Sequence, residues 1–289
     1  MPPVGPISHQ FLADAGSLTV HDWGGAGSPV LLAHPTGFHG RCWAPVAARL
    51  VAAGRRVWSF DFRGHGNSDP SPDGYHWDGF ARDVLAVIAH LGLAGDAALL
   101  PAGHSKGAAA LLLAEEERPG TFARLWCYEP IIFPSDEPLA PQEDFFLAES
   151  ARRRRAVWDS PEDALAAYGS KPPLDVLDRD ALHAYVEYGL RPRDDGTFEL
   201  KCRPDDEAAV YSMGMAHGAW RRLGEVQCPT VIACGELTDA IGPKLAGMIT
   251  ARIPRGRLEV VPGLGHFGPM QDPDAIVASM LAFAAATVR

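Results

Sequence analysis

The sequence lacks an excess of positive charge and has no long apolar run. Acidic residues outnumber Lys and Arg, 36 against 26, which gives a net charge of −10. This sign argues against nucleic acid or an anionic membrane as a partner. The one basic run, residues 152–155 (RRRR), stands beside Glu149 in a helical pattern and is interpreted as a solvated helix face. No apolar run approaches the roughly 20 residues that a membrane helix needs.

Cysteine is scarce as well. The five cysteines are odd in number and show no metal-ligand spacing, which predicts reduced thiols and neither a disulfide framework nor a metal site. The first residues, 1–6 (MPPVGP), lack the basic and apolar regions of a secretory signal. These absences predict a cytoplasmic protein, and they leave both a monomer and a homodimer open.

Short apolar segments alternate with helical patterns in the first and last parts of the chain. A hairpin is predicted over residues 9–22, with its turn at residues 14–16. Further strands are predicted at 30–33, 56–61, 97–102, 123–128, 229–234 and 257–261, and helices at 43–53, 77–91, 108–117, 244–252 and 273–285. The alternation predicts an α/β fold with a doubly wound, mostly parallel sheet flanked by helices.

This alternation stops between residues 131 and 222. The segment is proline-rich at its linkers and shows four helical patterns, at 143–157, 161–168, 178–188 and 205–220, with a polar turn at 193–196. We therefore predict a core domain from residues 1–130 and 223–289, interrupted by a helical lid at residues 131–222, called the cap below.

Residues 103–107 (GHSKG) fit the pattern of a nucleophile elbow, in which a strained turn between a strand and a helix exposes a serine. The predicted strand and helix on either side provide the context that gives the motif its meaning. The small flanking residues Gly103 and Gly107 permit such a turn. Ser105 is therefore the candidate nucleophile.

A serine hydroxyl needs a base, and the base needs an acid that orients it. His266 follows the last predicted strand in a glycine-rich loop and is the candidate base. Asp239, after the preceding strand, is the preferred acid. Glu236 in the same loop and Glu129 at the end of the neighbouring strand remain alternatives, because a carboxylate at either strand end could reach the histidine.

The oxyanion of an acyl-transfer reaction needs two preorganised N–H donors. One is expected from the backbone amide of Lys106, which follows the nucleophile. The other is expected from the loop at residues 34–40 (HPTGFHG), with the amide of Thr36 preferred and Gly37 as the alternate. Pro35 has no N–H to donate.

Together these segments resemble α/β-hydrolase-fold serine hydrolases, over residues 30 to 270 outside the cap. The resemblance implies a structural role for residues 61–69 (DFRGHGNSD). Three departures stand out: His34-Pro35 replaces the usual His-Gly, Lys106 replaces an apolar residue such as methionine, and Glu129 lies where zearalenone-type lactonases have their acid.

The expected reaction is hydrolysis of a carboxylic ester or lactone through an acyl-enzyme, without metal or organic cofactor. The expected substrate is a medium-sized, largely apolar small molecule, although an inward-pointing Lys106 would favour an acidic one. Alternatives are hydrolysis of a carbon–carbon bond in a diketone-like compound and, from a different class, a non-catalytic ligand-binding protein. The candidate substrate-binding residues are Phe38, Phe133, Trp158, Tyr211 and Phe267.

Overall fold

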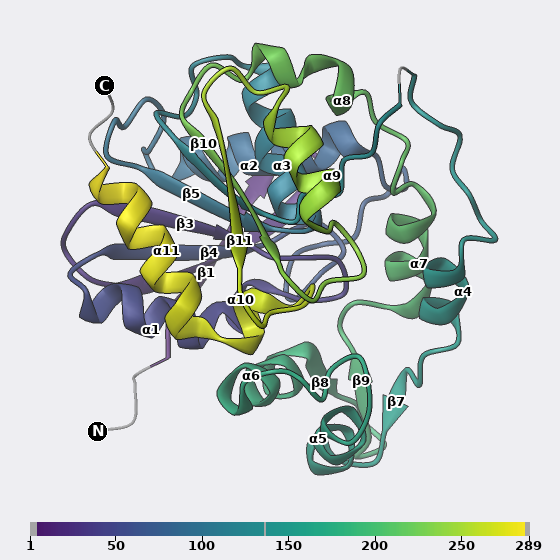
Figure 1. Ribbon diagram of the computed structural model, residues 1–289. Coiled ribbons are helices and arrows are strands. Elements are labelled where there is room, and N and C mark those ends of the chain that lie inside the picture. Colours follow the sequence, from purple (N-terminus) through teal and green to yellow (C-terminus); the bar gives the residue numbers. More distant parts are fainter. Residues whose placement is uncertain (1–4, 136, 287–289) are drawn as a thin grey trace.

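The computed structural model describes residues 5–135 and 137–286. The first four residues, on which the expectation of no secretory signal partly depends, lie outside the described residues. A twisted sheet forms its centre (Figure 1). In chain order its strands are β1 (Ile7–Ala13), β2 (Gly16–Gly24), β3 (Pro29–Ala33), β4 (Arg56–Asp61), β5 (Leu100–His104), β6 (Leu125–Tyr128), β10 (Thr230–Gly235) and β11 (Gly256–Val261). Their spatial order is β1-β2-β4-β3-β5-β6-β10-β11.

The hairpin β1–β2 is antiparallel and pairs antiparallel with β4, whereas the other strand pairs are parallel. Central strands such as β3 are buried along their whole length because helices cover both faces of the sheet. The predicted α/β fold class, with its mostly parallel sheet, is confirmed.

Helices cover the sheet from two sides (Figure 1). On one face α1 (Ala44–Ala52) and α11 (Pro273–Ala285) contribute Leu50 and Met280 to one apolar cluster. On the other face α2 (Trp77–His90), α3 (Lys106–Glu117) and α9 (Pro243–Thr250) contribute Ile88, Leu112 and Ile249 to a second cluster. Shorter helical turns lie at Gly40–Trp43, at Leu223–Glu225 and in α10 (Gly268–Gln271). No helix of the described ranges is long and apolar enough to span a bilayer.

The strand before the elbow begins later than predicted. Asp96 accepts hydrogen bonds from the amides of Ala98 and Leu99, so these residues form a turn, and β5 starts only at Leu100. The helix α3 starts directly at Lys106, two residues before its predicted start. The strand, turn and helix around Ser105 are therefore tighter than the sequence pattern indicated.

The chain between β6 and β10 includes the predicted cap, whose residues 157–200 lie beside the core at the lower right of Figure 1, whereas its last helix, at residues 219–222, lies at the top against the core. It contains α4 (Phe146–Arg152), α5 (Pro161–Gly169), α6 (Arg179–Gly189), α7 (Pro204–Ser212) and α8 (Ala219–Arg222). It also holds a small antiparallel sheet of β7 (Val157–Trp158), β9 (Phe198–Leu200) and β8 (Leu190–Pro192), which the sequence analysis did not predict. The polar turn at residues 193–196 is the loop of the β8–β9 hairpin.

Candidate active site

Ser105 stands in a strained turn between β5 and α3. Its backbone adopts φ 55° and ψ −118°, a conformation that residues other than glycine rarely adopt. The turn is tight enough that a Cβ on Gly103 would lie 2.6 Å from the Ala108 amide nitrogen, and one on Gly107 would lie 2.3 Å from the Ala33 carbonyl oxygen. The Ser105 amide donates to the Tyr128 carbonyl at 2.9 Å, which ties the elbow to β6.

Glu129 has the second strained backbone. Across the described ranges, Ser105 and Glu129 are the two non-glycine residues with positive φ, which is 46° at Glu129. Such a conformation costs about 1–3 kcal/mol and persists only where its surroundings enforce it. Here the Glu129 amide donates to the Ala233 carbonyl at 2.8 Å, which turns the side chain from the end of β6 under the end of β10. The strain therefore aims the carboxylate.

The Glu129 carboxylate is fully buried and accepts four hydrogen bonds. Oε1 accepts from the Gly235 amide at 3.0 Å. Oε2 accepts from Thr238 Oγ1 at 2.8 Å, from the Ile241 amide at 3.4 Å and from His266 Nδ1 at 2.7 Å. Donors of this number hold the carboxylate in one orientation.

His266 lies in the loop after β11, and its Nδ1 faces Glu129. An ionised carboxylate accepts only, so Nδ1 carries the proton and Nε2 of the neutral ring is free to act as a base. The Tyr128 hydroxyl fixes this loop by donating to the Gly265 carbonyl at 2.8 Å. The His266 ring packs 4.9 Å from the ring of His104, the residue before the nucleophile. Within the described ranges Ser105 Oγ makes no hydrogen bond, as is common before a substrate is bound.

The preferred acid of the sequence analysis, Asp239, lies elsewhere. It is exposed in the loop after β10 and makes no hydrogen bond or ion pair with any described residue. Glu236 is also exposed and accepts from the Gly263 amide. The geometry thus favours Glu129, the alternate acid, over Asp239. The physical reason is that the chain turns away after Gly235, whereas the Glu129 side chain turns inward.

The candidate oxyanion donors are positioned at the same edge of the sheet. Thr36 is buried in the loop after β3, and Lys106 begins α3. The backbone amides of both residues have no acceptor among the described residues. Gly37, the alternate donor, follows with φ 76°. An amide at a helix N-terminus also carries part of the positive end of the helix dipole, which favours a developing anion.

The Lys106 side chain neither reaches solvent nor enters a described cavity. It is fully buried, with its Nζ 4.3 Å and 4.7 Å from the ring centres of Phe62 and Phe80. Nζ lies 3.4 Å from His65 Nε2, and no carboxylate of a described residue is within ion-pair distance. Burial lowers the pKa of Lys106 to about 7. The side chain therefore points into the core between two aromatic rings, and not toward the space where a substrate would bind.

Of the candidate substrate-binding aromatics, Phe267 lies beside the histidine and Phe38 lies beside Phe267. The Phe267 ring is 5.4 Å from the His266 ring and 5.6 Å from the Phe38 ring. Trp158 packs against Tyr168 inside the cap, Tyr211 packs beside α4, and Phe133 lies against the core cluster of α2 and α3.

A charged group in the cap was missed by the sequence analysis. Arg154, one of four consecutive arginines, is partly buried, forms an ion pair with Glu207 and donates to the hydroxyls of Tyr168 and Tyr185 at 3.1 and 2.6 Å. The other three arginines bind exposed carboxylates. No sequence signal distinguishes Arg154 from its neighbours.

Comparison with known proteins places this geometry in a family. Residues 30–279 match the model of the alpha/beta hydrolase family, so the chain belongs to that family. Among curated proteins it is 25% identical over 283 residues to a non-heme haloperoxidase of Rhodococcus erythropolis, covering 94% of this chain and 97% of the relative. It is likewise 25% identical over 283 residues to a bifunctional esterase/perhydrolase of Acinetobacter calcoaceticus, covering 93% of this chain and 96% of the relative. Among solved structures, E-2-(acetamidomethylene)succinate hydrolase superposes with a TM-score of 0.79 at 20% identity, covering 97% of this chain and all of the other.

Proposed function

We propose that this protein hydrolyses a carboxylic ester or lactone through an acyl-enzyme on Ser105, with His266 as base and Glu129 as the acid that orients it. The observation that carries the proposal is the paired strain at Ser105 and Glu129, which sets a serine and a buried carboxylate at adjacent strand ends, with His266 hydrogen-bonded to the carboxylate. A likeness over nearly the whole chain to a protein named as an esterase supports the same reaction.

The first half of the reaction forms the acyl-enzyme. His266 Nε2 takes the proton of Ser105 Oγ as the oxygen adds to the carbonyl carbon. The amides of Thr36 and Lys106 hold the resulting oxyanion, and Glu129 stabilises the imidazolium. The tetrahedral intermediate then expels the alcohol oxygen, which takes the proton from His266.

The second half releases the acid. His266 takes a proton from water as the water oxygen adds to the acyl carbon, and the same amides hold the second oxyanion. When that intermediate collapses, Ser105 Oγ leaves and recovers its proton from His266. For a lactone, the alcohol and the acid released are the two ends of one product.

A fluorophosphonate probe tests the nucleophile directly, because it reacts with activated serines. At pH 7–8 we expect stoichiometric labelling of the wild-type protein at Ser105, located by peptide mass spectrometry, and no labelling of Ser105→Ala. A panel of acyl esters and lactones then defines the bond. A folded wild-type protein that resists labelling and turns over no member of the panel would rule the proposal out.

A further inference from the structure

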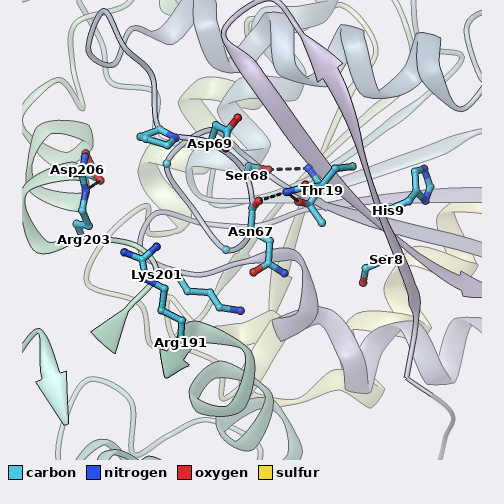
Figure 2. Close-up of a pocket in the computed structure, with 14 residues that line it drawn as sticks. Ser8, His9, Thr19, Asn67, Ser68, Asp69, Arg191, Lys201, Arg203 and Asp206 are labelled. Atoms are coloured by element: carbon cyan, nitrogen blue, oxygen red, sulfur yellow. Dashed lines mark hydrogen bonds and ion pairs between the residues drawn. The ribbon is translucent and has the colours of Figure 1, made fainter. Parts of the chain in front are cut away.

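Two cavities lie between the cap and the core. The larger, of about 710 Å³, is shown in Figure 2; the core supplies Gly66, Asn67 and Asp69 to its wall, and the cap supplies Arg191, Lys201 and Arg203. The smaller, of about 10 Å³, is bounded by Gly37 and Phe38 of the candidate oxyanion loop and by cap residues. Gly66 and Lys201 line both cavities. Lys201 therefore lies between the outer cavity and the smaller cavity beside the candidate oxyanion loop.

Of the three Lys and Arg side chains that line the outer cavity, Lys201 alone has no ion pair with a described residue. Arg191 pairs with Glu199 at 2.6 Å, and Arg203 pairs with Asp206 at 2.5 Å. Asp69 accepts a hydrogen bond from the Ser17 amide at 2.9 Å. The Lys201 ammonium has neither a hydrogen bond nor an ion pair with any described residue, although the side chain is partly buried.

The two other partly or fully buried cations near the site are not available to an anion. Arg154 lines the smaller cavity, but Glu207 neutralises its charge and its Nη2 donates to two tyrosine hydroxyls. Lys106 lines neither cavity. Lys201 is therefore the cation available to bind a negatively charged group. Its backbone is held in place because its amide donates to the Gly189 carbonyl at 2.9 Å.

We propose that Lys201, together with the Asn67 carboxamide, forms a subsite for a carboxylate carried by the substrate, away from the bond that is cleaved. Figure 2 shows the Lys201 and Asn67 side chains in the same cavity, one from the cap and one from the core. An ammonium supplies charge and a carboxamide supplies N–H donors, which together satisfy a carboxylate. The inference rests on the proposed function and amends its substrate class, from a largely apolar ester to one with an anionic end.

Matched esters test the subsite. One is the 4-nitrophenyl monoester of glutaric acid, which is anionic, and the other is the methyl 4-nitrophenyl diester, which is neutral and of similar size. We expect the wild-type protein to prefer the anionic ester in kcat/KM. Lys201→Met should reduce this preference at least tenfold, mainly through KM, while Lys201→Arg keeps most of it. The exposed cap lysine Lys171 provides the control, and Lys171→Met should keep the wild-type preference.

Ionic strength supplies a second readout that a merely structural role would not move. The wild-type preference should fall as salt is raised, whereas the remaining preference of Lys201→Met should not. If Lys201→Met retains the full preference, or the wild-type protein has none while hydrolysing the neutral diester, the subsite is wrong and the proposed function stands.

Binding separates the two proposals if neither ester is hydrolysed. Glutarate is then titrated calorimetrically into Ser105→Ala with and without Lys201→Met. Millimolar or tighter binding that weakens at least tenfold with the second substitution supports the subsite on its own. Equal binding in the two variants, or no binding in either, overturns it.

Discussion

Two charged side chains lie fully buried within reach of the same serine turn, and their surroundings are opposite. Glu129, at the end of β6, accepts four hydrogen bonds, one of them from His266. Lys106, at the start of α3, has two aromatic rings and one long contact to His65, and no carboxylate partner. The fold therefore solvates one charge with its own donors and leaves the other almost unsolvated.

This difference separates a charge that the fold supports from one that costs stability. A buried carboxylate with preorganised donors keeps its charge and so can orient a base and stabilise an imidazolium. A buried ammonium without a counter-ion gives up its proton more easily, since burial penalises the charged form. Burial alone therefore does not show whether a charged side chain can act in catalysis. The hydrogen-bond partners of the group determine whether it can keep its charge.

The largest expected effect comes from removing the Glu129 charge. Glu129→Gln keeps the shape but offers an N–H or a neutral oxygen to His266 Nδ1, so the ring loses its fixed tautomer and the support for its charge. We expect kcat for an activated ester to fall by about 10⁴-fold, the size seen when the acid of a serine triad is made neutral. Thermal unfolding of the variant checks that it is folded.

Asp239→Asn is the matched control for that substitution. Asp239 is exposed and has no described partner, so we expect kcat/KM to stay within threefold of the wild-type value. A large loss in Asp239→Asn, with Glu129→Gln active, would reverse the assignment of the acid.

The second expected effect concerns Lys106 and changes the free energy of unfolding. The pKa of Lys106 is about 7 in the folded protein, below the value of about 10.5 for an exposed lysine. Between these values the unfolded chain binds more protons, so this group makes stability rise with pH through that window. Below pH 7 both states are protonated and the burial cost is fully present.

Lys106→Met removes this titration and supplies an apolar residue, the type that the resemblance to serine hydrolases leads one to expect there. Urea unfolding should show the variant more stable than wild type at pH 6, by a few kcal/mol at about 1.4 kcal/mol per pKa unit, with a smaller gain at pH 9. Lys244→Met, at an exposed position, should show no such trend. A gain that does not change with pH would mean that Lys106 is not a buried titrating cation.

The comparison also explains what the sequence predicts and what it does not. The turn at Ser105 and the loop that carries His266 were predictable because each depends on a local pattern: a strand, a glycine-flanked turn and a helix for the turn, and a glycine-rich segment after a strand for the loop. The strands themselves follow from apolar runs. These are properties of short segments, which the sequence displays directly.

The acid depends on geometry that no short segment displays. Glu129 and Asp239 follow two strands that are neighbours in the sheet, β6 and β10, and either position is compatible with a partner for His266. The choice is made by the positive φ of Glu129 and by donors from the other loop. The cavity at the cap also depends on contacts between distant segments. Lys201 and Asn67 line it together because the β8–β9 hairpin folds over residues 64–70, and this short hairpin has only weak sequence signals.

The smallest expected effect comes from removing one of the hydrogen-bond donors to Glu129. Thr238→Val removes the hydroxyl that donates to Glu129 Oε2 at 2.8 Å and leaves the shape of the side chain nearly unchanged. With one donor of four lost, we expect kcat to fall about tenfold, in line with about 1.5 kcal/mol for a hydrogen bond to a charged group. Thr250→Val, which removes a hydroxyl bonded to the Ala246 carbonyl in α9, should leave kcat unchanged.

The variant Thr238→Ser distinguishes this role from a loss of packing. Serine keeps the hydroxyl that donates to Glu129 Oε2 and removes only a methyl group. We expect kcat of Thr238→Ser to stay within threefold of the wild-type value, whereas Thr238→Val loses about tenfold. An equal loss in both variants would show that Thr238 acts through the packing of its loop and not as a hydrogen-bond donor to Glu129.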